Sequence, residues 1–177
     1  MLNPLKESLW KQFGASIDML QNAISLWPDD LWNTDKKFFY SAYHVLVFLD
    51  YYLSIPPTAF SSPLPFTITE PENQPKDALD DVLPDEIYTK TELLAYLHSS
   101  REKCRSLIAS LTEEKLNERW IEEPENPESM NYSVLELLLY NMRHVQHHAA
   151  QLNLLLRQRI NNAPHWIARA EDGFGQI

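Results

Sequence analysis

The chain has 177 residues, of which 44% are hydrophobic and 23% charged, and its formal net charge is −10. This composition and length predict one globular domain over residues 1–177. The acidic balance argues against nucleic-acid binding, and three glycines leave no glycine-rich phosphate loop. We recognise no signal peptide and no apolar run of the roughly 18 residues that a membrane span needs. With Cys104 as its single cysteine, we expect a cytoplasmic protein without a membrane partner.

The first two predicted elements are helices. Apolar residues recur at steps of three or four from Leu5 to Trp27, which predicts an amphipathic helix that ends near Pro28. Residues 34–54 are so rich in aromatic side chains that propensity alone would favour a strand. Strands of that length are rare, so we predict a second helix, with Asn33 or Thr34 as its N-cap.

Residues 55–88 form a long connection that contains seven of the chain's 12 prolines. Neither helix nor sheet is expected for most of it. A connection of this length inside a small domain is unusual, and it tends to be functional or to cross the fold. It also allows the helices on either side to run parallel, where a short loop would make them antiparallel.

Two further helices are predicted after this connection. The third covers about residues 89–110, and the fourth follows an irregular stretch at residues 118–132. Ser133 is the expected N-cap of the fourth helix, with Glu136 as its capping-box partner, and Ile160 is near its end. The tail, residues 161–177, is left unassigned. The expected fold is therefore all-α, a four-helix bundle with a long proline-rich crossover between helices 2 and 3.

Three histidines occupy positions from which they can meet inside this bundle. His144 and His148 lie four residues apart, so both project from one side of the fourth helix and border its apolar face. His147 leans towards the polar side. His44 lies in the middle of the second helix, and its helical neighbours are apolar or aromatic, so it should point into the bundle. Bundle interiors commonly hold metal sites built from facing helices in this way.

Three imidazole ligands favour zinc, nickel, iron or cobalt over magnesium or calcium, which prefer oxygen. They also leave a coordination position for water, as in catalytic metal sites. The alternative is that His44, His144 and His148 are hydrogen-bonded core residues without a metal. No glutamate separates His144 and His148, so the zinc-protease motif HExxH is absent and the general base is not identified.

The remaining candidate side chains have simpler interpretations. The hydroxyls of Tyr40, Tyr51 and Tyr140 could donate to a bound oxyanion, although ordinary aromatic packing in the core is the favoured interpretation of each. Gln151 could line the site. His98 and His165 are interpreted as background, on the third helix surface and in the tail. We expect Cys104 to be a half-buried packing residue and not a nucleophile.

The context SAYHVLVFLDYYL around His44 and the segment HVQHHAAQLNLLLR on the fourth helix resemble the DinB-like superfamily. His44, His144, His148 and Gln151 match the family pattern of one helix-2 histidine, HxxxH on helix 4 and a glutamine three residues later. Ala149 and Ala150 replace the basic residue and glycine common there, which weakens any transfer of substrate contacts. The resemblance implies an up-down-down-up bundle, a divalent metal that is often nickel or zinc, and frequent homodimers.

These observations support two alternative functions. The first is a metal-dependent enzyme, a hydrolase or a thiol-dependent S-transferase, in which the metal at His44, His144 and His148 activates water or the thiolate of a low-molecular-weight thiol. Arg101 or Arg143 near the opening would favour a thiol cofactor. The second is a non-catalytic bundle that binds a small ligand or partner and has a vestigial metal site.

Overall fold

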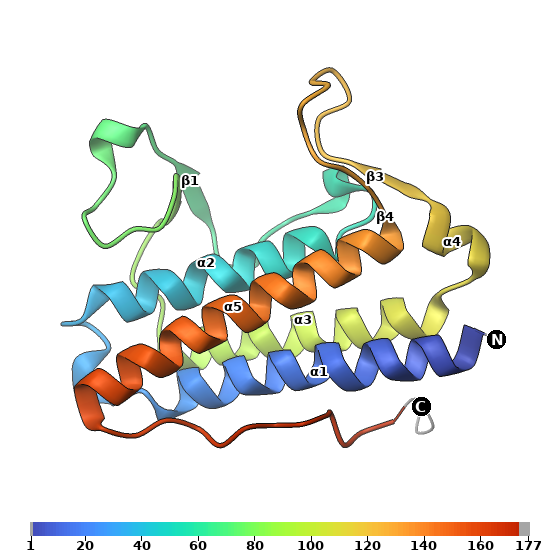
Figure 1. Cartoon of the computed structure of the whole chain (residues 1–177). Coiled ribbons are helices and arrows are strands. Elements are labelled where there is room, and N and C mark those ends of the chain that lie inside the picture. Colours follow the sequence, from blue (N-terminus) through green and yellow to red (C-terminus); the bar gives the residue numbers. More distant parts are fainter. Residues whose placement is uncertain (1, 174–177) are drawn as a thin grey trace.

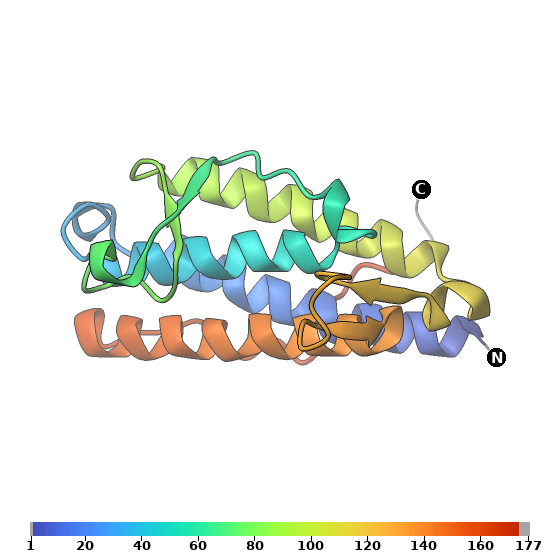
Figure 2. The ribbon, with the colours of Figure 1, turned by 90° about the horizontal axis from the view of Figure 1, so that it is seen from above.

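The computed structural model describes residues 2–173, so Met1 and the last four residues of the predicted tail lie outside the described residues. The structure is mostly helical, with a small strand content. Four long helices lie side by side (Figures 1 and 2): α1 (Leu2–Leu26), α2 (Lys36–Tyr52), α3 (Lys90–Ser110) and α5 (Val134–Ile160). None of the helices within residues 2–173 is long and apolar enough to cross a membrane.

The helices pair along their lengths through their apolar faces. Figure 1 shows α1 and α5 running in one direction and α2 and α3 in the other. Long-range contacts agree with this: the Asn141 amide donates to the carbonyl of Leu49 at 3.0 Å, whereas Arg159 meets Asp35 at the opposite ends of the same two helices. The core between the helices is formed by fully buried apolar residues from all four, among them Phe13, Phe38, Leu97 and Leu152.

The helix ends follow local capping chemistry. Thr89 forms a complete capping box with Glu92 at the start of α3. The Ser133 side chain accepts from the backbone N–H of Glu136, which confirms it as the N-cap of α5. The expected cap of α2 is wrong: Asp35 holds that position without a side-chain capping bond. Thr34 instead hydrogen-bonds carbonyls of the preceding turn.

The connections contain more regular structure than predicted, which corrects the all-α expectation. The crossover folds back on itself as the antiparallel pair β1 (Phe66–Ile68) and β2 (Val82–Pro84), and residues 118–133 form a second pair, β3 (Arg119–Ile121) and β4 (Asn131–Ser133). A short helix, α4 (Glu113–Asn117), and three 3-10 turns complete the elements: η1 (Asp29–Leu31), η2 (Pro57–Ala59) and η3 (Pro71–Asn73). Three-residue strands joined by long loops show no alternating pattern in the sequence, so periodicity could not reveal them.

Both strand pairs stand on the same side of the bundle, above α2 and α5 (Figure 1). The β3–β4 pair is attached by Trp120, which is fully buried and donates its indole N–H to the carbonyl of Ser54 at 2.9 Å. The crossover is attached near its first strand by Tyr43 and Tyr88, whose hydroxyls donate to the carbonyl of Pro65. These anchors fix the two hairpins on either side of the middle of α2 and α5.

The tail packs on the other side of the molecule. Residues 161–173 leave α5 and run back along α1 (Figure 1). The backbone N–H of Ala170 donates to the carbonyl of Lys11 at 2.8 Å, and the indole of Trp10 donates to the carbonyl of Asp172 at 2.6 Å. The described part of the tail is therefore an extended strap held by α1 and α3.

Candidate metal centre

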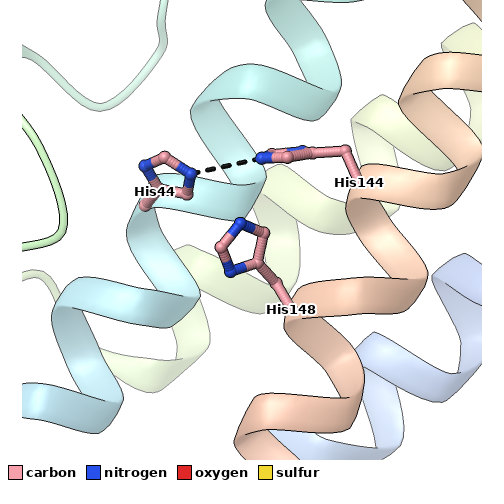
Figure 3. A group of neighbouring side chains, drawn as sticks. All are labelled: His44, His144 and His148. Carbon is pink, nitrogen blue, oxygen red and sulfur yellow. Dashed lines mark hydrogen bonds between the residues drawn. The ribbon is translucent and has the colours of Figure 1, made fainter.

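The site is built where the middles of α2 and α5 face each other. Asn141 is fully buried, and its amide bond to Leu49 fixes the position of α5 along α2. One turn further along α5, this places His144 opposite His44, and the i, i+4 spacing adds His148 one turn later. Figure 3 shows the three imidazoles gathered in the space between the two helices.

The distances between these rings are those of a ligand group. The Nε2 atoms of His44 and His144 lie 3.2 Å apart, and one potential ligand atom from each of the three histidines falls within 4.8 Å of the others. In a tetrahedral site with Zn–N bonds of about 2.0 Å, neighbouring ligand nitrogens are about 3.3 Å apart. The His44–His144 pair already has this spacing, and the third imidazole is close enough for the group to hold a divalent transition metal. Among residues 2–173, the three histidines form the group of three potential metal ligands whose donor atoms lie this close together.

Side-chain oxygens lie close to the outward nitrogens of two of the rings, and one of these contacts is a hydrogen bond. The Nδ1 of His148 lies 2.8 Å from Oε1 of Gln151, whose amide nitrogen is 3.0 Å from the Nε2 of His147. The Nδ1 of His44 lies 2.7 Å from Oδ2 of Asp80, at an ion-pair distance but off the line of a hydrogen bond. An acceptor at Nδ1 favours the tautomer with its proton there, which leaves the Nε2 lone pair free for a metal.

The Nδ1 of His144, like that of His44, is buried with no hydrogen-bond partner among the described residues, and it also lacks an ion-pair contact such as the one between His44 and Asp80. Phe48 and Tyr52 pack edge-on against the ring of His144, with centroid distances of 6.0 Å in both cases. The Nε2 of His144 contacts Nε2 of His44, but a buried imidazole nitrogen without a partner, such as this Nδ1, is costly for stability. Such a cost is typical of positions retained for function, where a ligand supplies the missing interaction.

Burial also keeps two of the histidines uncharged. Desolvation, followed by the neighbouring His148, lowers the pKa of His144 from 6.5 to about 3. Desolvation, followed by His44, lowers the pKa of His148 to about 4. Imidazole binds a metal only in its neutral form. These two rings are therefore ready to bind at neutral pH and do not become protonated until the solution is strongly acidic.

The tyrosines considered from the sequence do not face the histidines in the described contacts. The hydroxyl of Tyr51 donates to Oε1 of Glu122 at 3.3 Å, and burial with the nearby Glu122 raises the Tyr51 pKa to about 12. Tyr140 packs against the ring of Tyr52, and Tyr40 packs against Phe39. The role of an oxyanion donor for these residues stays a prediction.

The other sequence-based assignments have mixed outcomes. His98 and His165 are exposed, as expected of background residues. Cys104 is fully buried and not half-buried, and desolvation raises its thiol pKa well above the usual range, so it is an inert core residue. Arg101 is 12% exposed and forms ion pairs with Asp18 and Asp172 on the tail side, away from the histidines.

One comparison with known proteins identifies a family for this chain. A family model described as the DinB superfamily matches residues 12–152, a stretch that contains all three histidines. The chain belongs to the DinB superfamily. Comparisons with curated proteins and with solved structures found no match. The family assignment covers the bundle from the middle of α1 to the middle of α5, and it names no substrate or reaction.

Sequence reasoning missed one residue at this site, Asp80. It comes from the crossover, 36 positions after His44, and reaches the imidazole only because β1 and β2 pair. No motif marks it, since one aspartate in an acidic loop is unremarkable. Gln151 was considered as a site-lining group; the structure shows its contact with His148, which its i+3 spacing on the helix makes possible.

Proposed function

We propose that this protein binds one divalent transition metal, zinc or nickel before iron or cobalt, through His44, His144 and His148, and that it is a metal-dependent hydrolase. The observation that carries the proposal is the convergence of three imidazoles, one from α2 and two from α5, to within 4.8 Å of one another. The up-down-down-up order expected from the family fits the helix directions of Figure 1 and belongs to this proposal.

A metal at three nitrogens keeps a position for water and makes that water a nucleophile near neutral pH. Other residues of the chain prepare the histidines for metal binding. His144 and His148 stay neutral because they are desolvated. Gln151 holds the outer nitrogen of His148, and the rings of Phe48 and Tyr52 shield one side of His144 from water.

The charges around the site favour hydrolysis over transfer to an anionic thiol cofactor. The β1–β2 hairpin carries five acidic residues against Lys76, and the β3–β4 hairpin carries four glutamates against Arg119. Like charge repels the carboxylates of common low-molecular-weight thiols. Arg101, one of two arginines that could have offset this field, is paired elsewhere. A thiol-dependent transferase is therefore the weaker version of the proposal, and a non-catalytic ligand-binding bundle is the competing function.

The test is elemental analysis of untagged protein purified without chelator, comparing wild type with His44→Ala and with His98→Ala as the matched control. We expect one equivalent of zinc or nickel in wild type and in the control, and none in His44→Ala. Hydrolysis of ester, amide and phosphoester substrates is then screened with loaded and chelator-treated protein. Absence of metal in wild type, even after incubation with zinc and nickel, would leave the non-catalytic bundle.

A further inference from the structure

The crossover hairpin contacts the metal site through one side chain. Asp80 lies just before β2, and its carboxylate is fixed by its own hairpin, because Oδ1 accepts from the backbone N–H of Val82 at 3.1 Å. The carbonyl of the next residue, Asp81, accepts from the N–H of Thr69 across the hairpin at 2.9 Å. The second oxygen of Asp80 is thereby directed at His44.

The contact is close and partly shielded from water. Oδ2 of Asp80 is 2.7 Å from Nδ1 of His44, and the two side chains are 26% and 14% exposed. The ring N–H does not point straight at the oxygen. The terminal torsion of histidine is broad, so a small rotation of the ring aligns the two groups. Several other side chains of this hairpin, such as Glu72, Asp77 and Leu79, are exposed, which makes Asp80 the one of these that reaches inward.

We infer that Asp80 is a positioning residue for the metal centre: its carboxylate holds His44 with the proton on Nδ1 and the Nε2 lone pair directed at the metal. The inference rests on the proposed metal site and adds a role that comes from the crossover. Acceptors behind metal-binding imidazoles fix the tautomer and raise ligand basicity, and their loss typically weakens metal binding 10- to 100-fold. Because coupling between binding events is reciprocal, bound metal should also stabilise the contact between the hairpin and His44.

The hairpin has enough other anchors for Asp80 to be replaced without unfolding the chain. Tyr43 donates to the carbonyls of Leu64 and Pro65, and Thr67 donates to Asp85 at 2.8 Å. Asp80→Asn is the informative variant. It keeps one oxygen for the N–H of Val82, so a residue that only shapes the hairpin turn would tolerate it. An amide, however, cannot offer an acceptor to both Val82 and His44.

The first measurement is zinc affinity by competition with a chelator for wild type, Asp80→Asn and Asp81→Asn. Asp81 is exposed and adjacent, so its variant makes the same change of charge without touching His44. We expect a loss of about 10-fold or more in Asp80→Asn, and wild-type affinity in Asp81→Asn. Wild-type affinity in Asp80→Asn, or an equal loss in both variants, would overturn the role of Asp80.

The second measurement needs no metal and separates this inference from the proposed function. Nitrogen NMR of the metal-free protein reports which ring nitrogen of His44 carries the proton. We expect a single Nδ1–H tautomer in wild type and a mixture in Asp80→Asn. If wild type binds no metal, the proposed function fails, and the tautomer alone decides whether Asp80 orients His44. The same tautomer in both proteins would overturn the inference.

Discussion

The two sides of the bundle differ in how their buried polar side chains are hydrogen-bonded. On the tail side, the Arg101 guanidinium forms paired hydrogen bonds with Asp172, binds Asp18 and lies 4.9 Å above the ring of Trp10. On the opposite side, three imidazoles meet, and the Nδ1 of His144 is buried without a partner among the described residues. The tail side is a network of charged hydrogen bonds that joins chain segments, although the Nε of Arg105 is buried in it without a partner among the described residues. On the histidine side, three imidazoles converge on one point.

This difference separates structural polar groups from functional ones. A satisfied network stabilises the fold, and removing one member leaves the others unpaired. An incompletely satisfied cluster costs stability in the free protein and recovers it when a ligand binds. The predictions below test this contrast by changing one side at a time.

The largest expected effect is on the tail side. Arg101→Ala should lower the free energy of unfolding by about 3 kcal/mol, because Asp18 loses its partner and Asp172 keeps only Arg105, at 3.8 Å, in a partly buried network. Urea unfolding measures this change, with Arg143→Ala, an exposed arginine on α5, as the control. Metal content should stay at the wild-type level. If Arg101→Ala lowers the free energy of unfolding no more than Arg143→Ala does, the network does not stabilise the fold.

A smaller effect is expected where the tail touches α1. A Cβ on Gly14 would lie 2.8 Å from the Cβ of Ala170, so Gly14→Ala should push the tail away and destabilise the protein. Alanine favours the helix by about 1 kcal/mol, which limits the net loss to about 1 kcal/mol. In the Arg101→Ala background, with the tail already loosened, the same change should become neutral or stabilising. An unchanged loss in that background would contradict the docking of the tail.

On the histidine side, we expect a substitution to increase stability and not to lower it. His144→Leu removes a buried Nδ1 that has no partner among the described residues, together with the Nε2 contact to His44 at 3.2 Å. We expect a net gain in stability of about 1 kcal/mol for the metal-free protein. The same variant should lose stoichiometric metal binding. Urea unfolding of chelator-treated protein tests the gain in stability. A loss of more than 1 kcal/mol would mean that His144 is a structural core residue, like the members of the tail network.

A further difference is expected in pH dependence. The pKa values of His144 and His148 are about 3 and 4 in the folded chain and near 6.5 when unfolded. Between pH 6.5 and about 4 the unfolded chain therefore binds more protons, so the metal-free protein should lose stability as the pH falls through this window. His144→Leu should show a shallower loss. Unfolding midpoints at pH 7.5, 6 and 5 test this, and equal slopes would argue against neutral buried histidines.

The sequence was informative where the structure is periodic. The spacing of apolar residues predicted the four long helices, and HxxxH together with an inward His44 predicted the three residues that the structure brings together. It could not predict the β1–β2 and β3–β4 pairs, because three-residue strands held by long-range anchors such as Trp120 leave no local pattern. Asp80 was missed for the same reason, since its place depends on a loop that the whole fold positions.

Local chemistry alone also misplaced some details. Thr34 is a good capping residue, yet its hydroxyl bonds to the turn before α2, and the N-cap lies one position later, at Asp35. Cys104 looked half-buried between Lys103 and Arg105, whereas packing of α3 against its neighbours buries it completely. At Thr34 a competing local turn outweighs the capping preference, whereas at Cys104 the packing between helices decides.

The most direct test of the central claim is X-ray absorption at the metal edge of the zinc-loaded protein. We expect three imidazole nitrogens at about 2.0–2.1 Å and one further light ligand. No sulfur scattering is expected, since Cys104 is buried in the core. His144→Leu, treated in the same way, should give no protein-bound signal of this kind. A first shell of sulfur, or of oxygen without imidazole scattering, would contradict a metal centre at His44, His144 and His148.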